Sequence, residues 1–213
     1  LGAKRRCRAS LMRVAVTAEN PMIKEIPPQS KSKPAIPNGL LGMIIFILTE
    51  IMFFAGLVSA HIIVKSNAAG GIWPPIGQPR LPLEQTLFNS VALILSGLFL
   101  WVANRKFKQA HQKALRPMLV SLALGVFFVV AQGFEWVALI AQGLPLTSSA
   151  HGAFFYLIIG IHGLHALCAI LILGYAMVKL LKNNLDHSTF WTAQAFWYFV
   201  VGVWPILYIQ VYL

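Results

Sequence analysis

The sequence predicts an all-α integral membrane protein, a bundle of five transmembrane helices with the N-terminus in the cytoplasm and the C-terminus outside. Hydrophobic residues make up 58% of the 213-residue chain and charged residues only 11%, which leaves too little polar surface for a soluble domain. The hydrophobic residues gather into continuous runs of about 18 residues or more, long enough to cross a bilayer. Because these runs do not alternate with polar residues, they indicate helices and not the strands of a membrane barrel.

The first 38 residues differ in composition from the rest of the chain. Residues 1–38 contain eight Lys or Arg and five Pro. Such a segment cannot bury a core, so we expect a mobile, solvated tail. It has no apolar region of the kind that a secretory signal needs. The membrane bundle is therefore expected in residues 39–213.

Five apolar segments of the bundle are long enough for helices that cross about 30 Å of hydrocarbon. The fourth segment is longer than this thickness requires and should tilt or protrude. Pro205 is expected to kink the fifth, because proline removes a helical hydrogen bond. The predicted spans cover about residues 40–64, 86–103, 118–142, 150–181 and 190–213.

The basic residues decide the predicted orientation. Eight lie in the tail, five within 105–116 and two within 179–182, all on one side of the predicted membrane, whereas the other side has only Lys65 and Arg80. Lys and Arg are retained on the cytoplasmic side, so the N-terminus is expected inside and Leu213 outside. The net charge of +11 follows from this topology and does not indicate a nucleic-acid-binding face.

Two carboxylic acids, Glu50 and Glu135, are predicted to lie within the spans. Glu50 is about 15 Å along its helix, near the bilayer midplane, where an ionised carboxylate costs about 2.5–3.5 kcal/mol. It therefore indicates either a proton-linked or cofactor-linked site, or a protonated acid bonded to a neighbouring helix. Glu135 is nearer the outer interface, where a structural anchoring role is favoured.

Histidines mark the fourth span. His162 and His165 are spaced i and i+3 and are expected on one helical face, where they could chelate a metal or ligate a heme. A metal needs further ligands, and only His61 and Glu135 are candidates nearby. Hydrogen bonding between helices by neutral imidazoles is favoured over a metal site.

Aromatic residues crowd the last span. Such rings suit contacts with lipid headgroups and with other subunits. The residues expected to make contacts of this kind are Trp197, Trp204, Trp101 and His61.

The sequence lacks the motifs of a catalytic centre. It has no phosphate-binding Gly loop, no nucleophilic triad, no Cys-x-x-Cys-His for heme attachment and no copper-type cysteine cluster. Its two cysteines, Cys7 and Cys168, have no metal-binding spacing. The spans also do not show the duplicated halves of many transporters. Catalysis by this chain alone is therefore not expected.

All five spans carry ordered motifs: the first reads Thr-Glu-Ile-Met-Phe-Phe-Ala-Gly at Thr49–Gly56, and the fourth reads Gly-Ile-His-Gly-Leu-His at Gly160–His165. They resemble the Ser/Thr-Glu-x-x-Phe-Phe-Ala-Gly and Gly-x-His-Gly-x-His signatures of one family, subunit III of cytochrome c oxidases and related quinol oxidases. The third has the pattern Gln132-x-x-Glu135. The match covers about residues 40–213, and its other positions are Asn89, Ser96, Gly97, Trp101, Leu124, Gly125, Val203, Trp204, Leu207 and Tyr208.

The resemblance implies an accessory subunit of a respiratory heme–copper oxidase in aerobic electron transport. Such a subunit binds no heme or copper itself, packs beside the catalytic subunit I in a complex with subunit II, holds phospholipid, supports proton uptake and protects the active site during turnover. Glu50 matches the family's buried carboxylate, and Glu135, His162 and His165 match its other polar positions. A bacterial inner membrane is the expected location, with the mitochondrial inner membrane as the alternative.

The chain departs from the family pattern in two ways. It has five predicted spans where the family often has seven, and the two absent helices help to form the family's lipid-holding cleft. In the last span Tyr198 and Val201 stand where the family has His and Asp. Three alternatives stay open: a subunit III-like protein of a nitric oxide reductase system, a small membrane heme- or metal-binding redox protein, and a proton-coupled carrier built around Glu50.

Overall fold

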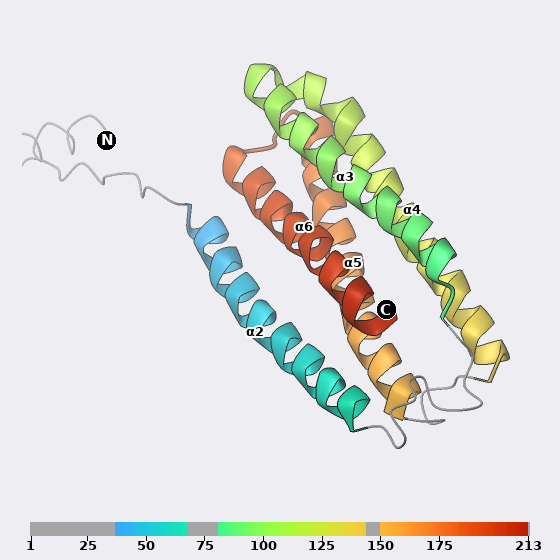
Figure 1. Cartoon of the computed structure of the whole chain (residues 1–213). Helices are drawn as coiled ribbons and strands as arrows, with labels where there is room; N and C mark the ends of the chain where they lie inside the picture. The colour runs from blue at the N-terminus through green and yellow to red at the C-terminus, as the bar shows by residue number, and fades with distance from the viewer. Residues whose placement is uncertain (1–36, 68–80, 144–149, 213) are drawn as a thin grey trace, which may run out of the picture. The chain divides into compact units, whose positions relative to one another are not determined.

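The computed structural model describes residues 37–67, 81–143 and 150–212 (Figure 1). Over these residues the chain is helical, and five helices are long and apolar enough to cross a membrane, which confirms the predicted all-α bundle of five spans. Nearly all of the predicted tail lies outside the described residues. The long helices are α2 (Asn38–Ser66), α3 (Leu83–Gln109), α4 (Leu115–Ala141), α5 (Ala150–Leu181) and α6 (His187–Leu207).

Two of the helices run further than their apolar spans. α3 continues to Gln109 and carries Arg105, Lys106 and Lys108 on its last turns, where basic side chains interact favourably with the helix dipole. α4 follows a 3-10 turn, η2 (His111–Ala114), and has Pro117 in its first turn. Proline is tolerated there because the N–H that it lacks has no helical acceptor.

The last helix changes type near its proline. α6 ends at Leu207 and continues as a π-helical turn, η3 (Tyr208–Tyr212). Pro205 has no N–H to donate to the carbonyl one turn earlier, so the regular hydrogen-bond pattern is interrupted just before the π turn. The disturbance expected at Pro205 therefore takes the form of a change in helix type.

Successive helices run in opposite directions (Figure 1). α3 packs along α4, and α5 packs along α6, while α4 also lies against α5 and α3 against α6. α2 contacts α6 and α5, but only Phe54 and His61 of α2 are buried. α2 is therefore the least embedded of the five helices.

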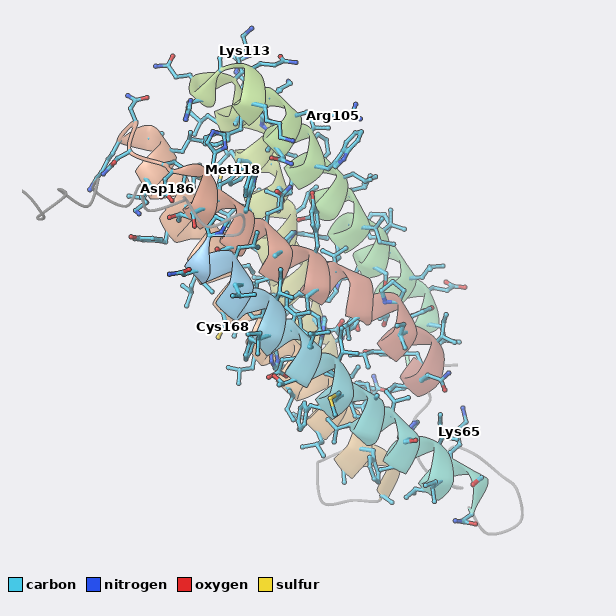
Figure 2. The ribbon with its side chains drawn as sticks, turned by 90° about the vertical axis from the view of Figure 1, so that its left-hand side faces the viewer. Lys65, Arg105, Lys113, Met118, Cys168 and Asp186 are labelled. Atoms are coloured by element: carbon cyan, nitrogen blue, oxygen red, sulfur yellow. The ribbon has the colours of Figure 1, made fainter. Side chains whose placement is uncertain are left out.

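The two ends of the bundle differ in charge. Figure 2 shows Lys65 at one end of the helices, and Arg105 and Lys113 toward the other. The end of α3, the start of α4 and the end of α5 together also bring Lys106, Lys108, Arg116, Lys179 and Lys182 to the basic end. This distribution matches the asymmetry of the sequence, while the orientation in the membrane stays a prediction.

One glycine is required by close packing in the core. Trp197 of α6 is fully buried, and a Cβ atom added at Gly125 of α4 would overlap its ring. Hydrogen at this position lets the indole lie directly against the α4 backbone.

Candidate functional site

Glu50 and His165 form an ion pair or hydrogen bond between α2 and α5. Oε2 of Glu50 lies 3.1 Å from Nε2 of His165, and the two side chains are 18% and 13% exposed. This contact joins the least embedded helix to the rest of the bundle. It is also the partner that a carboxylic acid at this depth requires.

A favourable contact between Oε2 of Glu50 and Nε2 of His165 requires one proton between the two atoms. Nδ1 of His165 lies 2.8 Å from the backbone oxygen of Ile161, and because a carbonyl oxygen only accepts, Nδ1 must carry a hydrogen. Nε2 can then face a carboxyl group favourably in two ways: neutral imidazole with the acid protonated, or imidazolium with the carboxylate. Both arrangements have zero net charge, which lowers the cost of burying the pair.

Phenylalanine rings surround this pair. The ring centroid of Phe54 lies 5.5 Å from that of His165, and those of Phe196 and Phe199 each lie 6.2 Å away. Phe46 stacks on the imidazole at 6.4 Å. An apolar enclosure of this kind lowers the local dielectric and strengthens the contact between Glu50 and His165.

His162 does not join this pair, although it shares a helix face with His165. Its imidazole is 1% exposed and lies over Trp204 of α6, with ring centroids 5.1 Å apart. Its Nε2 has no hydrogen-bond partner within the described residues. It lines a pocket of about 320 Å³ between α4 and α5, opposite Trp136. The two imidazoles therefore serve different helix contacts.

Glu135 accepts hydrogen bonds from α3 and from its own helix, α4. Its Oε2 accepts hydrogen bonds from the Thr86 hydroxyl of α3 (2.9 Å) and from Nε2 of Gln132, one turn earlier on α4 (2.8 Å). Nε2 of Gln132 also donates to the Tyr212 hydroxyl in η3 at 3.0 Å. Glu135 thus ties α3 to α4 and, through Gln132, to η3.

A line of polar residues on α3 holds the neighbouring helices. Ser90 accepts a hydrogen bond from Nε1 of Trp204 at 2.7 Å, and Ser96 accepts one from Nε1 of Trp197 at 3.0 Å. Ser96 in turn donates to the backbone oxygen of Ser121 on α4 at 2.8 Å. Ser96 matches a family position in the sequence, whereas Ser90 and Thr86 were not singled out from it. Their spacing on one face of an apolar helix was the available signal.

The residues expected at a lipid or subunit surface lie in different environments. Trp101 is 46% exposed, and the Arg105 guanidinium lies over its ring at 3.7 Å from the centroid. Trp197, Trp204 and His61 are fully buried inside the bundle. The two indoles are therefore packing and hydrogen-bonding groups within this chain, and the His61 ring contacts Phe154, with ring centroids 5.8 Å apart.

The two replaced family positions have structural partners of their own. Tyr198 accepts a hydrogen bond at 2.7 Å from Nε2 of Gln194, one turn earlier on α6. Val201 packs against α3, where a Cβ atom at Gly97 would lie 3.2 Å from its Cγ1. No charged group occupies this part of the contact between α3 and α6 in the described residues.

The polar groups do not converge into a metal site. Within residues 37–67, 81–143 and 150–212, no cluster of three or more His, Cys, Asp or Glu side chains could hold an ion. The arrangement can instead link helices and hold protons at fixed places.

Comparison with known proteins gives one consistent result. The family model described as Cytochrome c oxidase subunit III matches residues 8–213. Among similar proteins, the Cytochrome c oxidase subunit 3 of Dasypus novemcinctus is 32% identical over 200 residues, which is 90% of this chain and 76% of the relative. The proteins of the same name from Felis catus and Bos taurus are 31% and 30% identical over the same shares.

Proposed function

The chain belongs to the cytochrome c oxidase subunit III family and is an accessory, multi-pass membrane subunit of a heme–copper oxidase, and from this we propose what it does within that complex. It packs on the catalytic subunit I, binds phospholipid, and sustains proton uptake and activity over many turnovers. It contributes no heme or copper ligand, and the redox centres belong to partner subunits. Subunit II completes the complex around them.

The observation that carries this proposal is the contact between Glu50 and His165. A carboxyl–imidazole pair joins two helices, and no further ligand of the metal-binding kind reaches it within the described part of the chain. Such a pair supports a role in stabilising the subunit and its surroundings. It does not supply an electron carrier.

We assign the outward face of α2 to the contact with subunit I. This face exposes small residues, including Ala55, Gly56 and Ser59, and a Cβ atom at Gly56 would meet no neighbour within 4 Å. Small residues let helices from two subunits approach closely in a membrane. Met52, in the middle of this face, is 75% exposed in the isolated chain.

A photo-crosslinking experiment tests this assignment. A benzophenone side chain in place of Met52 should form an adduct with the largest subunit of the purified complex. The matched control is the same side chain at Leu171 of α5, another highly exposed position, which should label lipid. An adduct of position 52 with lipid alone would place the contact on another helix.

Depletion of the subunit tests its function. Removal of this chain from the complex should leave the initial rate of oxygen reduction near its full value, while activity should decline within many fewer turnovers. The isolated chain should show no Soret absorbance and no stoichiometric iron or copper. Complete loss of the first turnover, or a bound heme, contradicts an accessory role.

A second candidate function is a subunit III-like role in a nitric oxide reductase system. The replacement of the family His and Asp by Tyr198 and Val201 favours a divergent branch. Mass spectrometry of the proteins that co-purify with the chain separates the two candidates, because the catalytic subunits differ.

For location we propose a bacterial plasma membrane, with the basic end of the bundle in the cytoplasm. The concentration of Lys and Arg at one end supports this orientation. Reporter fusions test the orientation: a periplasm-active reporter should work after Leu213 and fail within the loop before α4.

A further inference from the structure

A groove of about 550 Å³ lies between the start of α3 and the end of α4. Its polar lining includes Glu84, Asn89 and Glu135, and its apolar walls include the rings of Phe88, Phe127 and Phe134. Phe88 and Phe134 are 71% and 72% exposed. The groove therefore opens away from the bundle, toward the surrounding membrane.

Two buried side chains at this groove carry acceptors that no described hydrogen bond uses, of which Oδ1 of Asn89 is itself enclosed by protein atoms. Asn89 is 2% exposed and donates its Nδ2 to the backbone oxygen of Phe128 at 3.1 Å, which fixes the amide with Oδ1 on the other side. Oδ1 has no hydrogen-bond partner within the described residues. Both hydrogen bonds to Glu135 end on Oε2, so its Oε1 is also available.

The depth of these acceptors corresponds to the membrane interface. Glu84 lies in the first turn of α3. The bond from Thr86 to Glu135 places Glu135 at the level of residue 86, about 4.5 Å along the helix from Leu83. Asn89 is one turn deeper. The groove thus runs from the headgroup level into the upper hydrocarbon, with acceptors at the top and phenylalanine rings along its walls.

Acceptors without donors call for a ligand that only donates. A primary ammonium has three N–H donors and no acceptor, its charge complements the two carboxyl groups, and its contact with phenylalanine faces is favourable. Within the described residues, no Lys or Arg lines the groove. The attraction between a carboxylate and a cation is also stronger where water is excluded.

We infer that this groove binds the primary ammonium headgroup of an aminophospholipid, with Glu135 and Glu84 as its acceptors. A lipid is the occupant that this depth favours, because its ammonium lies at the interface and its acyl chains can follow the exposed rings of Phe88 and Phe134 downward. The inference names a site and a lipid class, and so rests on the lipid binding included in the proposed function. The Glu50–His165 pair has no part in it.

Native mass spectrometry of the purified complex tests the inference. The complex is exchanged into mixed micelles of phosphatidylethanolamine and phosphatidylcholine, which differ in N–H donors. Wild-type complex should retain phosphatidylethanolamine preferentially, and retention should fall stepwise through the mono- and dimethylated headgroups. Equal retention of both lipids overturns the inference. Because lipid is still bound in that case, the proposed general lipid binding would stand.

Variants locate the site. Glu84→Gln, at an exposed position, and Glu135→Gln should each lower the preference for phosphatidylethanolamine, Glu135→Gln by roughly tenfold, as expected for one lost charge-assisted hydrogen bond. The matched control is Asp186→Asn, which removes an acid at the opposite end of the bundle and should change nothing. The assignment is overturned if neither variant changes the preference for phosphatidylethanolamine. Glu84→Gln guards against misfolding, because it keeps the buried network intact.

A protein cation is the competing occupant. Carbodiimide crosslinking followed by peptide mapping shows whether Glu84 or Glu135 joins a lysine of a partner subunit. Such a crosslink at high yield, or headgroup preference that first emerges in an Arg80→Gln variant, would show that a basic side chain fills the groove in place of lipid.

Discussion

Glu50 of α2 and His165 of α5 face each other across 3.1 Å, and the Ile161 carbonyl accepts the hydrogen on Nδ1 of His165, so that one proton between the facing atoms satisfies both. The contact therefore has a defined donor and acceptor count. This count determines which substitutions it tolerates.

Glu50→Gln should be tolerated and Glu50→Ala should not. A glutamine N–H can donate to Nε2 of His165, whereas alanine leaves that nitrogen without a partner, at a cost of about 0.5–2 kcal/mol. We expect the Ala variant to lower the midpoint of thermal unfolding and to release the subunit from the complex more readily. Initial oxygen reduction should stay near wild type in both variants.

The double variant Glu50→Ala/His165→Ala supplies the control for this pair. Its destabilisation should be smaller than the sum of the two single changes, because either change alone removes the same interaction. Strict additivity would show that the two side chains do not interact in the assembled protein.

Gly125→Ala should destabilise the bundle by about 1–3 kcal/mol, since the added methyl group overlaps the buried Trp197 ring. Gly133→Ala, on the same helix, is the matched control, because its Cβ atom would meet nothing within 4 Å. Alanine has the higher helix propensity, so the control should be neutral or slightly stabilising. Thermal unfolding in detergent distinguishes the two, and equal effects would contradict the close packing of α4 on Trp197.

Ser90→Ala should cost about 1–2 kcal/mol, because it leaves the buried indole N–H of Trp204 without its acceptor. The exposed Ser59→Ala on α2 is the control for loss of a hydroxyl. Replacing Trp204 by Phe in the Ser90→Ala background should recover part of the loss, since no donor is then unpaired. If thermal unfolding shows no recovery, the cost comes from packing and not from the hydrogen bond.

Asp186 should give α6 a stability that depends on pH. Its carboxylate accepts from the backbone N–H of Thr189 at 3.0 Å and from the Thr189 hydroxyl at 2.5 Å, and chiefly these bonds hold the pKa of Asp186 below its ordinary value of 3.8. A lowered folded-state pKa contributes stability that is fully present above the unfolded value. This contribution is lost as the pH falls from about 4 through the folded-state pKa.

Hydrogen exchange at the first turn of α6 measures this effect. Protection of the amides around Thr189 should fall below about pH 4 in the wild type, whereas Asp186→Asn, which retains a capping oxygen, should show no such fall. Asp186→Ala should lose about 1 kcal/mol of local stability near neutral pH. A wild-type profile identical to that of the Asn variant would exclude the carboxylate as the cause.

The five spans could be predicted because hydrocarbon thickness and apolar run length determine them almost alone. The ends of the helices were harder to predict from the sequence. α3 continues through Arg105 to Gln109, since helical hydrogen bonds do not stop where the apolar run stops. The sequence likewise marked Glu50 and His165 as groups that need a partner. That each is the other's partner depends on the packing of α2 against α5, which local spacing does not encode.

Two expectations show that local spacing does not determine which helices a side chain contacts. His162 and His165 share a helix face, yet His165 points to α2 and His162 lies over Trp204 of α6, because α5 is covered by different helices on either side of that face. Trp197 and Trp204 suited an interface by residue type. They lie inside because Ser96 and Ser90, on another helix, offer acceptors for their indole N–H groups.

The low burial of α2, and its contacts with α5 and α6, have a consequence for biosynthesis. α2 is the first of the five described helices to leave the ribosome, but its neighbours α5 and α6 are made last. Glu50 therefore enters the bilayer before its partner His165 has been synthesised. Until α5 is inserted, the Glu50 carboxyl must be protonated or bound by the insertion machinery. The packing of α2 against α5 and α6 can therefore form only at the end of assembly.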